Sequence, residues 1–114
     1  MSTGDERVRR LAHNEALFRE VNETVGRLAA THGTDSHRYD FLCECSDQRC
    51  VQLVALSLGE YEAVRARGDR FAIVAGHEAP EIERVVERHE RYAVVEKLGE
   101  GAVIAHQLDP RKPG

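Results

Sequence analysis

The sequence predicts one α+β domain in which a long N-terminal helix packs on a small, mostly antiparallel sheet, with one further short helix. Three observations support this prediction. Residues 6–31 repeat apolar side chains at helical spacing, the short apolar runs that follow resemble strands, and turn residues separate those runs. With 114 residues the chain has room for one domain, residues 1–114, and we expect disordered tails at 1–5 and 109–114.

The prediction of the N-terminal helix rests on two heptad-spaced series: Leu11, Phe18 and Val25, and Asn14, Val21 and Leu28. The simpler interpretation is an amphipathic helix whose stripe packs on the domain's own sheet. The alternative is the seam of a homodimer or of a complex with another protein. Such a seam is considered because ~26 residues at about 1.5 Å each span ~39 Å, more than so small a core requires. Gly33 would end the helix as its C′ residue.

Local signals predict the elements in the middle of the chain. In order, these are a strand at 37–45, a return strand at 51–56, a short helix at about 58–67 and a third strand at 71–75. Polar residues at 46–49 form the turn between the first two strands. The short helix begins with the capping-box pattern from Ser57 to Glu60, and Gly68 closes it.

The region 80–89 fits two structures. Its apolar spacing suits a helix, but a helix would place Glu83 beside Glu87 and so pair like charges four residues apart. A strand from Glu83 to Arg88 avoids this repulsion, and we prefer it. Two further strands are expected at 92–98 and 102–106, joined by a glycine-containing turn.

The composition restricts the class of protein. Hydrophobic residues make up 41% of the chain and charged residues 32%, which argues against a disordered chain and against a membrane protein. No apolar run approaches the ~18 residues that cross a bilayer and no apolar leader follows Met1, so we expect a cytoplasmic protein. The formal charge of −4 argues against a nucleic-acid partner.

All three cysteines lie in the motif C-E-C-S-D-Q-R-C at 43–50. On an extended backbone Cys43 and Cys45 point to the same side, and the turn can bring Cys50 back to face them. Three thiolates on one hairpin suit a tetrahedral site for a soft metal ion, so zinc is the expected cofactor and would staple the hairpin.

A structural zinc site needs a fourth ligand. Our first choice is His77, at the end of the third predicted strand, where Gly76 frees the backbone. His37 is the second choice because it lies just before the cysteine strand, and Asp47 in the turn is the third. A cysteine of a partner chain remains a further alternative.

Other interpretations of the cysteines are core filling, redox-active thiols, a disulfide with one thiol left over, and an iron–sulfur cluster. Cys45 and Cys50 flank a polar turn, which argues against core filling. The odd count and the lack of a secretion signal argue against a disulfide. An iron–sulfur cluster would normally need a fourth cysteine.

His77 followed by Glu78 invites a comparison with zinc hydrolases and deaminases. The spacing does not support it, because Glu81 stands where the second histidine of H-E-x-x-H would be. Phosphate-binding loops and nucleophile elbows are also missing from the sequence. We therefore predict no catalytic residue, and expect that the protein is not an enzyme.

Four segments of the chain resemble a set of small actinobacterial proteins. They are Phe41-x-Cys43-x-Cys45, Glu60-Tyr61-Glu62-x-Val64-Arg65, Gly76-His77-Glu78 and Val94-Val95-Glu96-Lys97. The likeness covers most of the chain from Asn14 to Lys97 and carries no activity. It implies that the cysteines and His77 belong to one shared design.

The sequence thus predicts a zinc-stabilised regulatory module that binds another protein, with a metal site made of Cys43, Cys45, Cys50 and His77. A zinc centre would compensate for a small core that has few aromatic residues. The second hypothesis is a thiol switch that loses zinc on oxidation. The third is a metal-dependent enzyme.

Overall fold

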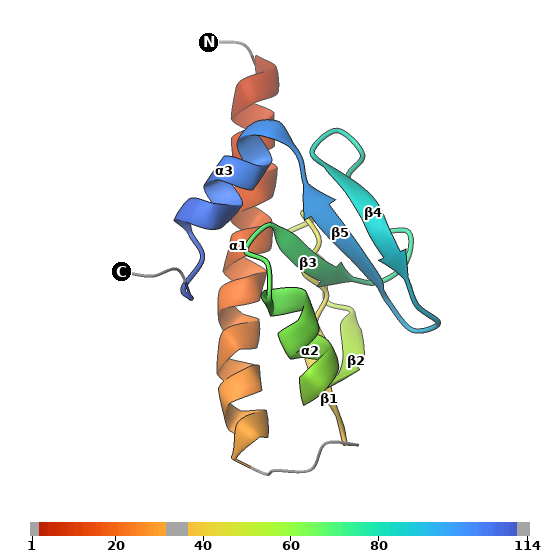
Figure 1. Ribbon diagram of the computed structural model, residues 1–114. Helices are drawn as coiled ribbons and strands as arrows, with labels where there is room; N and C mark the ends of the chain where they lie inside the picture. Colours follow the sequence, from red (N-terminus) through yellow and green to blue (C-terminus); the bar gives the residue numbers. More distant parts are fainter. Residues whose placement is uncertain (1–2, 32–36, 112–114) are drawn as a thin grey trace.

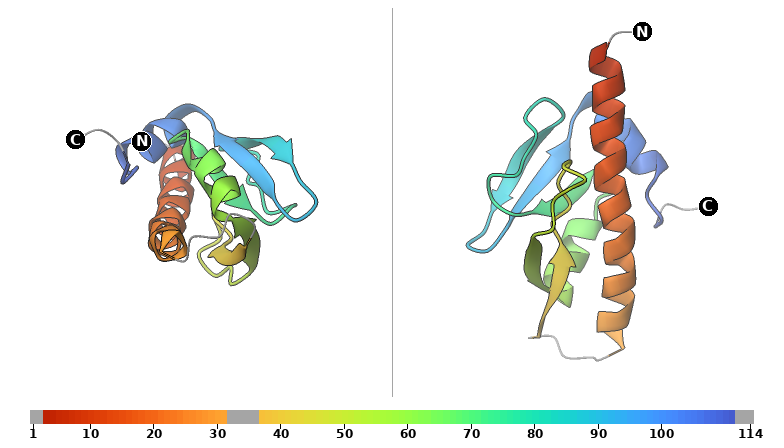
Figure 2. Two further views of the ribbon diagram at one scale, coloured as in Figure 1. Left: turned by 60° about the horizontal axis from the view of Figure 1, so that its bottom comes forward. Right: turned by 180° about the vertical axis from the view of Figure 1, so that it is seen from behind.

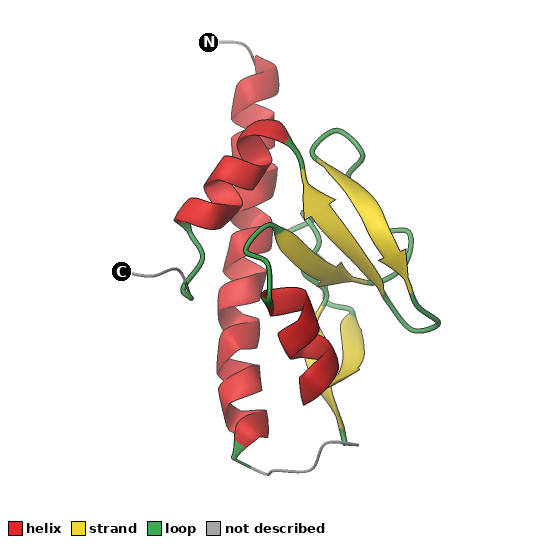
Figure 3. Ribbon diagram, in the orientation of Figure 1, coloured by secondary structure: helices red, strands yellow, loops and turns green. Residues whose placement is uncertain are grey.

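The computed structural model describes residues 3–31 and 37–111 (Figure 1). Its elements in chain order are α1 (Thr3–Ala30), β1 (Arg38–Leu42), β2 (Leu53–Ser57), α2 (Leu58–Arg65), β3 (Arg70–Ile73), β4 (Glu83–Arg88), β5 (Ala93–Lys97) and α3 (Gly99–Gln107). In this part of the chain the strands pair into two antiparallel sheets, β1–β2 and β3–β5–β4. The predicted α+β class, with its long first helix, is therefore confirmed (Figure 3).

The strands form two sheets, where we expected one, because the chain changes partner after β1. Cys43 donates its backbone N–H to the carbonyl of Gln52, just before β2, at 3.0 Å. Glu44, the next residue, donates instead to the carbonyl of Ala72 in β3, at 2.9 Å. The strand predicted at 37–45 consequently ends at Leu42, and residues 43–45 bridge the two sheets.

The start of α1 differs from the prediction. The helix begins at Thr3, so residues 3–5 are helical and do not form part of a disordered tail. Ion pairs of Arg7 with Glu81 and of Arg9 with Glu100 anchor the first turns to distant segments. Residues 1–2, and the helix end predicted at Gly33, lie outside the described residues.

The face that α1 turns toward the domain contains only part of the predicted apolar stripe. Leu11, Phe18 and Val25 are half-buried, and Val25 packs against the core. Val21 and Leu28 are exposed, and so is Leu17. The buried positions of the helix carry small, polar and charged residues: Ala12, Glu15, Ala16, Arg19, Asn22, Glu23, Gly26 and Ala29. The prediction that the heptad stripe packs on the domain is therefore wrong for Val21 and Leu28. The polar residues are tolerated inside because partners from distant segments meet them there.

The apolar core lies between α2 and the strands rather than along α1. Phe41 of β1 stacks on Tyr61 of α2, with ring centroids 4.4 Å apart. Phe71, Ile73 and Val95 of the three-stranded sheet are fully buried beside them. Gly26 lets α1 approach this core, because a Cβ there would lie 3.1 Å from the Tyr61 ring.

The capping box and the preferred strand are confirmed. Ser57 accepts a hydrogen bond from the backbone N–H of Glu60, whose side chain accepts one from the backbone of Ser57. The helix ends at Arg65, two residues earlier than expected. Glu83–Arg88 is a strand, as preferred, with a bulge between Val85 and Glu87.

The strand predicted at 102–106 is wrong, because the chain forms α3 there. Gly99 turns the chain away from the sheet with a positive φ of 54°, which glycine adopts without strain. Gly101, Ile104 and Ala105 are the buried positions, and this spacing of three and four is helical. So short an apolar run does not distinguish helix from strand by periodicity alone.

The tail predicted to be disordered from residue 109 is anchored over its first part. Asp109 is buried and forms an ion pair with Arg65. Arg111 forms ion pairs with Glu23 of α1, at 2.6 Å, and with Glu62 of α2. These contacts fix residues 109–111, whereas 112–114 lie outside the described residues.

Among the described residues, no helix combines the length and the apolar character needed to span a bilayer.

Candidate metal centre

The centre is built on the loop between β1 and β2, and α1 holds the start of that loop. The side-chain oxygen of Asn22 accepts the backbone N–H of Leu42 at 2.8 Å, and its amide group donates to the Leu42 carbonyl at 2.9 Å. The same amide group donates to the carboxylate of Glu44 at 2.9 Å. Asn22 therefore fixes the backbone on which Cys43 begins the motif.

Glu44 separates the two leading cysteines and points away from them. It is fully buried, and its other carboxylate oxygen accepts the backbone N–H of Ala72 at 3.0 Å. Burial raises the pKa of Glu44 to about 7, although the hydrogen bonds from Asn22 and Ala72 oppose the rise. With Glu44 anchored between α1 and β3, Cys43 and Cys45 both face the other side of the segment.

A tight turn brings Cys50 back toward Cys45. The backbone N–H of Cys50 donates to the carbonyl of Asp47 at 2.9 Å, and the Asp47 carboxylate accepts the backbone N–H of Arg49 at 2.9 Å. Asn14 of α1 donates to the carbonyl of Ser46 at 2.9 Å and so ties the turn to the helix. The turn predicted at 46–49 is thus formed.

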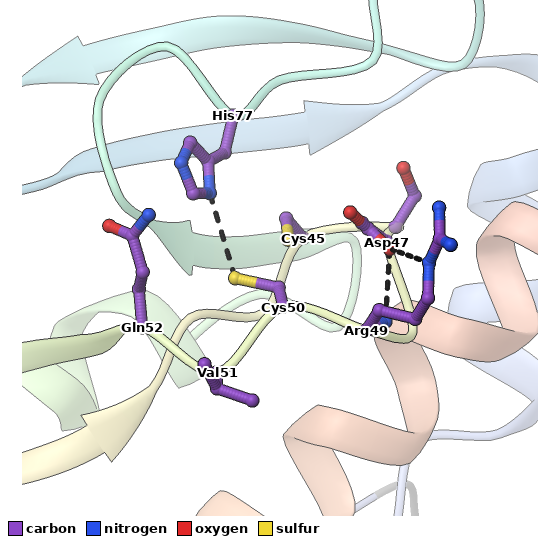
Figure 4. A pocket seen from close by; sticks show the side chains of 8 residues that line it. Cys45, Asp47, Arg49, Cys50, Val51, Gln52 and His77 are labelled. Carbon is purple, nitrogen blue, oxygen red and sulfur yellow. Dashed lines mark hydrogen bonds and ion pairs between the residues drawn. The ribbon is translucent and has the colours of Figure 1, made fainter.

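His77 reaches the sulfurs from the loop after β3. Its backbone N–H donates to the carbonyl of Val74 at 3.0 Å, closing a turn in which Gly76 has a φ of 93°. Nδ1 of His77 lies 3.5 Å from Sγ of Cys43 and 3.7 Å from Sγ of Cys50. Figure 4 shows the imidazole above Cys50, with Cys45 behind.

The four candidate ligands converge on one point. The ligand atoms of Cys43, Cys45, Cys50 and His77 all lie within 4.8 Å of one another, and the three cysteines form no disulfide. Cys43 and Cys45 are buried, whereas Cys50 and His77 are half-buried at the wall of a cavity of about 490 Å³. The group can hold a metal ion, with one side of it open to solvent.

Each of the three sulfurs also accepts a backbone N–H. Val74 donates to Cys43 at 3.2 Å, Asp47 donates to Cys45, and Gln52 donates to Cys50. For Cys45 and Cys50 the donor lies two residues further along the chain. A backbone N–H aimed at sulfur stabilises the thiolate, which is the form that binds metal ions.

The thiols share their protons unequally. A hydrogen bond from Cys43 is the main cause that lowers the pKa of Cys45, to about 5, against the opposing effect of burial. The same hydrogen bond, together with burial, raises the pKa of Cys43, and burial raises that of Cys50. One thiolate therefore forms readily, and a bound cation would displace the remaining protons.

The structure also places the other two candidates for the fourth ligand. His37 packs edge-on against Tyr39, with ring centroids 4.5 Å apart. Asp47 is exposed, and its carboxylate accepts the N–H of Arg49. Neither belongs to the group of converging ligand atoms, whereas His77 does.

Sequence reasoning missed the residues that hold the ligands in place. Asn22 lies about 20 residues before the motif, and only the fold brings it to Leu42 and Glu44. A polar residue within a helical stretch is compatible with a solvated face, so it carries no signal of this role. The donors two residues after Cys45 and Cys50 could have been found, since that spacing is local.

Comparisons of the chain with protein-family models, curated proteins and solved structures find no match.

Proposed function

We propose that this chain is a small zinc-stabilised module that binds another protein and has no catalytic role. The observation that carries the proposal is the convergence of three sulfurs and one imidazole nitrogen within 4.8 Å. This donor set is soft, and zinc is its usual occupant in proteins. Three thiolates, a neutral imidazole and Zn²⁺ would give the centre a net charge of −1.

The four ligands would complete the four-coordinate sphere that zinc prefers. A catalytic zinc ion normally keeps one position for water, whereas a sphere closed by four protein ligands is the structural type. Glu78, beside His77, is not a member of the converging group. The donor set therefore supports a structural role for the ion.

A bound ion would join two loops that come from different sheets. Cys43, Cys45 and Cys50 lie on the β1–β2 loop, whereas His77 lies on the loop between β3 and β4. Such a link would stabilise the junction, where the chain otherwise depends on a core with only three Phe and three Tyr residues. The protein-binding part of the proposal is supported by the exposed apolar residues of α1, which include Leu17 and Leu28.

Metal analysis of protein purified with a reductant tests the proposal. We expect close to one zinc per chain, and a cobalt-substituted protein should show the absorption of a tetrahedral sulfur-rich site. His77→Gln should lower zinc affinity about 10-fold or more, because it removes a ligand. His37→Gln is the matched control and should retain the metal. A folded, metal-free wild type would refute the proposal.

A thiol switch is the second candidate, and the half-buried position of Cys50 at the cavity wall favours it. A peroxide would accept two electrons from the thiolates of Cys45 and Cys50, which would form a disulfide while the peroxide is reduced and the zinc ion leaves. Titration with peroxide distinguishes the two functions. A switch releases zinc at low oxidant and recovers it with a dithiol, whereas a purely structural centre resists that dose.

A further inference from the structure

The outer face of α1 carries an apolar seam with coiled-coil spacing. Leu17, Val21 and Leu28 are 56%, 44% and 61% exposed, and Thr24 lies between the last two. Their spacings of four, three and four residues place them along one line of the helix. This line is opposite the buried residues such as Arg19 and Glu23.

Nothing in the described part of the chain covers this seam. Seen from behind, α1 lies between the strands of both sheets on one side and α3 on the other (Figure 2). A hollow of about 280 Å³ lies next to the seam, lined by His13, Ala16, Leu17, Glu20 and Leu108. The seam and its hollow are therefore accessible to side chains of another molecule.

The charges beside the seam of one chain are complementary to those beside the same seam of a second, antiparallel copy. Glu20 and Arg27 are both exposed, and their separation of seven residues places them on the same flank of the seam. Glu20 forms no ion pair with any other described residue, and Arg27 contacts only the Thr24 hydroxyl by hydrogen bond there, at 3.1 Å. In an antiparallel helix pair this flank meets itself, so Glu20 of each chain would face Arg27 of the other.

We infer that the outer face of α1 binds a second copy of this chain, with the two helices antiparallel about a two-fold axis. In this register Leu17 lies opposite the partner's Leu28, and Val21 lies opposite the partner's Thr24. The partner's Leu28 thereby sits beside the hollow that adjoins Leu17. Because the axis repeats each contact, the interface contains two leucine layers and two Glu20–Arg27 pairs.

This inference names the partner of the proposed protein-binding module and so rests on that part of the proposed function. The seam from Leu17 to Leu28 is about 17 Å long, which predicts a weak dimer that dissociates on dilution. Sedimentation equilibrium of the zinc-loaded chain should show a mass that rises with concentration from 12.8 kDa toward twice that value. A mass that stays at 12.8 kDa up to about 1 mM would overturn the inference.

Substitutions locate the interface. Val21→Glu should abolish the concentration-dependent rise in mass, whereas Val103→Glu, which is 54% exposed on α3, is the matched control and should dimerise like the wild type. A dimer that survives Val21→Glu would overturn the inference. Zinc content and circular dichroism are measured on each variant, because an exposed substitution should change neither. Loss of the dimer with zinc retained, or the reverse, separates failure of this inference from failure of the metal site.

Charge reversal tests the antiparallel register. Glu20→Arg places like charges at both ends of the interface and should weaken dimerisation at least about five-fold, and Arg27→Glu should do the same. An equimolar mixture of the two variants restores opposite charges at both contacts and should recover a heterodimer of wild-type strength. A mixture that remains as weak as its components would overturn the register.

Discussion

The inner face of α1 buries charged and polar residues, whereas its outer face exposes the larger apolar ones. On the inner face Glu15 and Arg19 are fully buried, and on the outer face Leu28 is 61% exposed. The usual amphipathic helix has the opposite arrangement. The difference shows that a polar side chain of α1 can be buried where another segment supplies a hydrogen-bonding or ion-pair partner. The polarity of a side chain alone does not decide whether it lies on the inner or the outer face of the helix.

The inner face aligns α1 through directed contacts. Arg19 donates to the carbonyls of Gly68, at 2.7 Å, and Ala105, at 2.8 Å, and its guanidinium lies 4.6 Å from the centre of the Phe71 ring. Such contacts add little net stability over well-packed apolar residues, but removing one partner leaves the other unsatisfied. The hydrogen bonds of Arg19 can form only when α1 lies at one position along the domain.

The largest effect on the inner face is expected for Lys97→Ala. The ammonium group of Lys97 contacts the carboxylates of Glu15 and Glu83, and all three side chains are fully buried. At about pH 5, where Lys97 carries its proton, removing this side chain leaves the buried acidic groups of Glu15 and Glu83 without their cation, which should lower the free energy of unfolding by about 3–5 kcal/mol. Urea unfolding of the zinc-loaded protein, followed by circular dichroism, measures this loss.

Arg84→Ala is the control for Lys97→Ala. Arg84 pairs with Glu96 on the same sheet at 2.8 Å, but its side chain is 66% exposed. An exposed pair contributes less than about 1 kcal/mol. If both substitutions cost the same, the buried position of Lys97 would have no special energetic role, and the comparison between buried and exposed charge would fail.

Glu83 should make the inner face sensitive to pH. Burial raises the pKa of Glu83 to about 7 from 4.5, despite the backbone N–H of Ala79, and nearby Cys45 and Glu78 raise it further. Between pH 4.5 and about pH 7 the folded state therefore binds more protons at Glu83 than the unfolded state does. The stabilisation that comes from protonated Glu83 is fully present below about pH 4.5 and is lost as the pH rises through 7. Its full size is about 3 kcal/mol.

Glu83→Gln removes this titration and serves as the reference. Burial also lowers the pKa of Lys97, to about 6, which gives stability that increases as the pH rises above that value. The metal's contribution is common to both proteins, whereas Lys97 contacts Glu83 and its titration changes with the substitution, so the difference between the proteins reports the Glu83–Lys97 pair. Between about pH 5 and about pH 7 the free energy of unfolding of the wild type should fall relative to the variant. Parallel pH profiles would contradict the assignment.

The sequence predicted well those elements that depend on local signals. The capping box at Ser57, the strand from Glu83 and the convergence of the motif with His77 all follow from patterns within a few residues, or from the few ligand types that suit a soft metal ion. The inner face of α1 could not be predicted in this way. Its buried Glu15 is tolerated because Lys97 reaches it from β5, more than 80 residues away.

The same reasoning explains the errors at the end of the chain. The apolar run at 102–106 suits either helix or strand, and its structure depends on Ala105 meeting Arg19 across the domain. Residues 109–114 were expected to form a disordered tail, but Asp109 pairs with the buried Arg65. In each case the deciding contact joins segments that are far apart in the sequence.

The smallest effect is expected on the outer face, and two neighbouring residues allow a matched test. Leu28 is 61% exposed and Ala29 is 2% exposed. Glutamine has a helix propensity close to those of leucine and alanine, so Leu28→Gln and Ala29→Gln differ mainly in burial. Ala29→Gln overpacks the inner face and should cost about 1–3 kcal/mol, whereas Leu28→Gln should change the free energy of unfolding by less than about 0.5 kcal/mol.

The measurement has to be made at a dilution at which any dimer has dissociated, because an interface would add its own stability to Leu28. Under those conditions the exposed part of the Leu28 side chain contacts only solvent, so its replacement removes few protein contacts. An equal cost for the two substitutions would mean that Leu28 already has a partner within its own chain. The difference between the two faces would then disappear, and with it the reason to expect a second copy there.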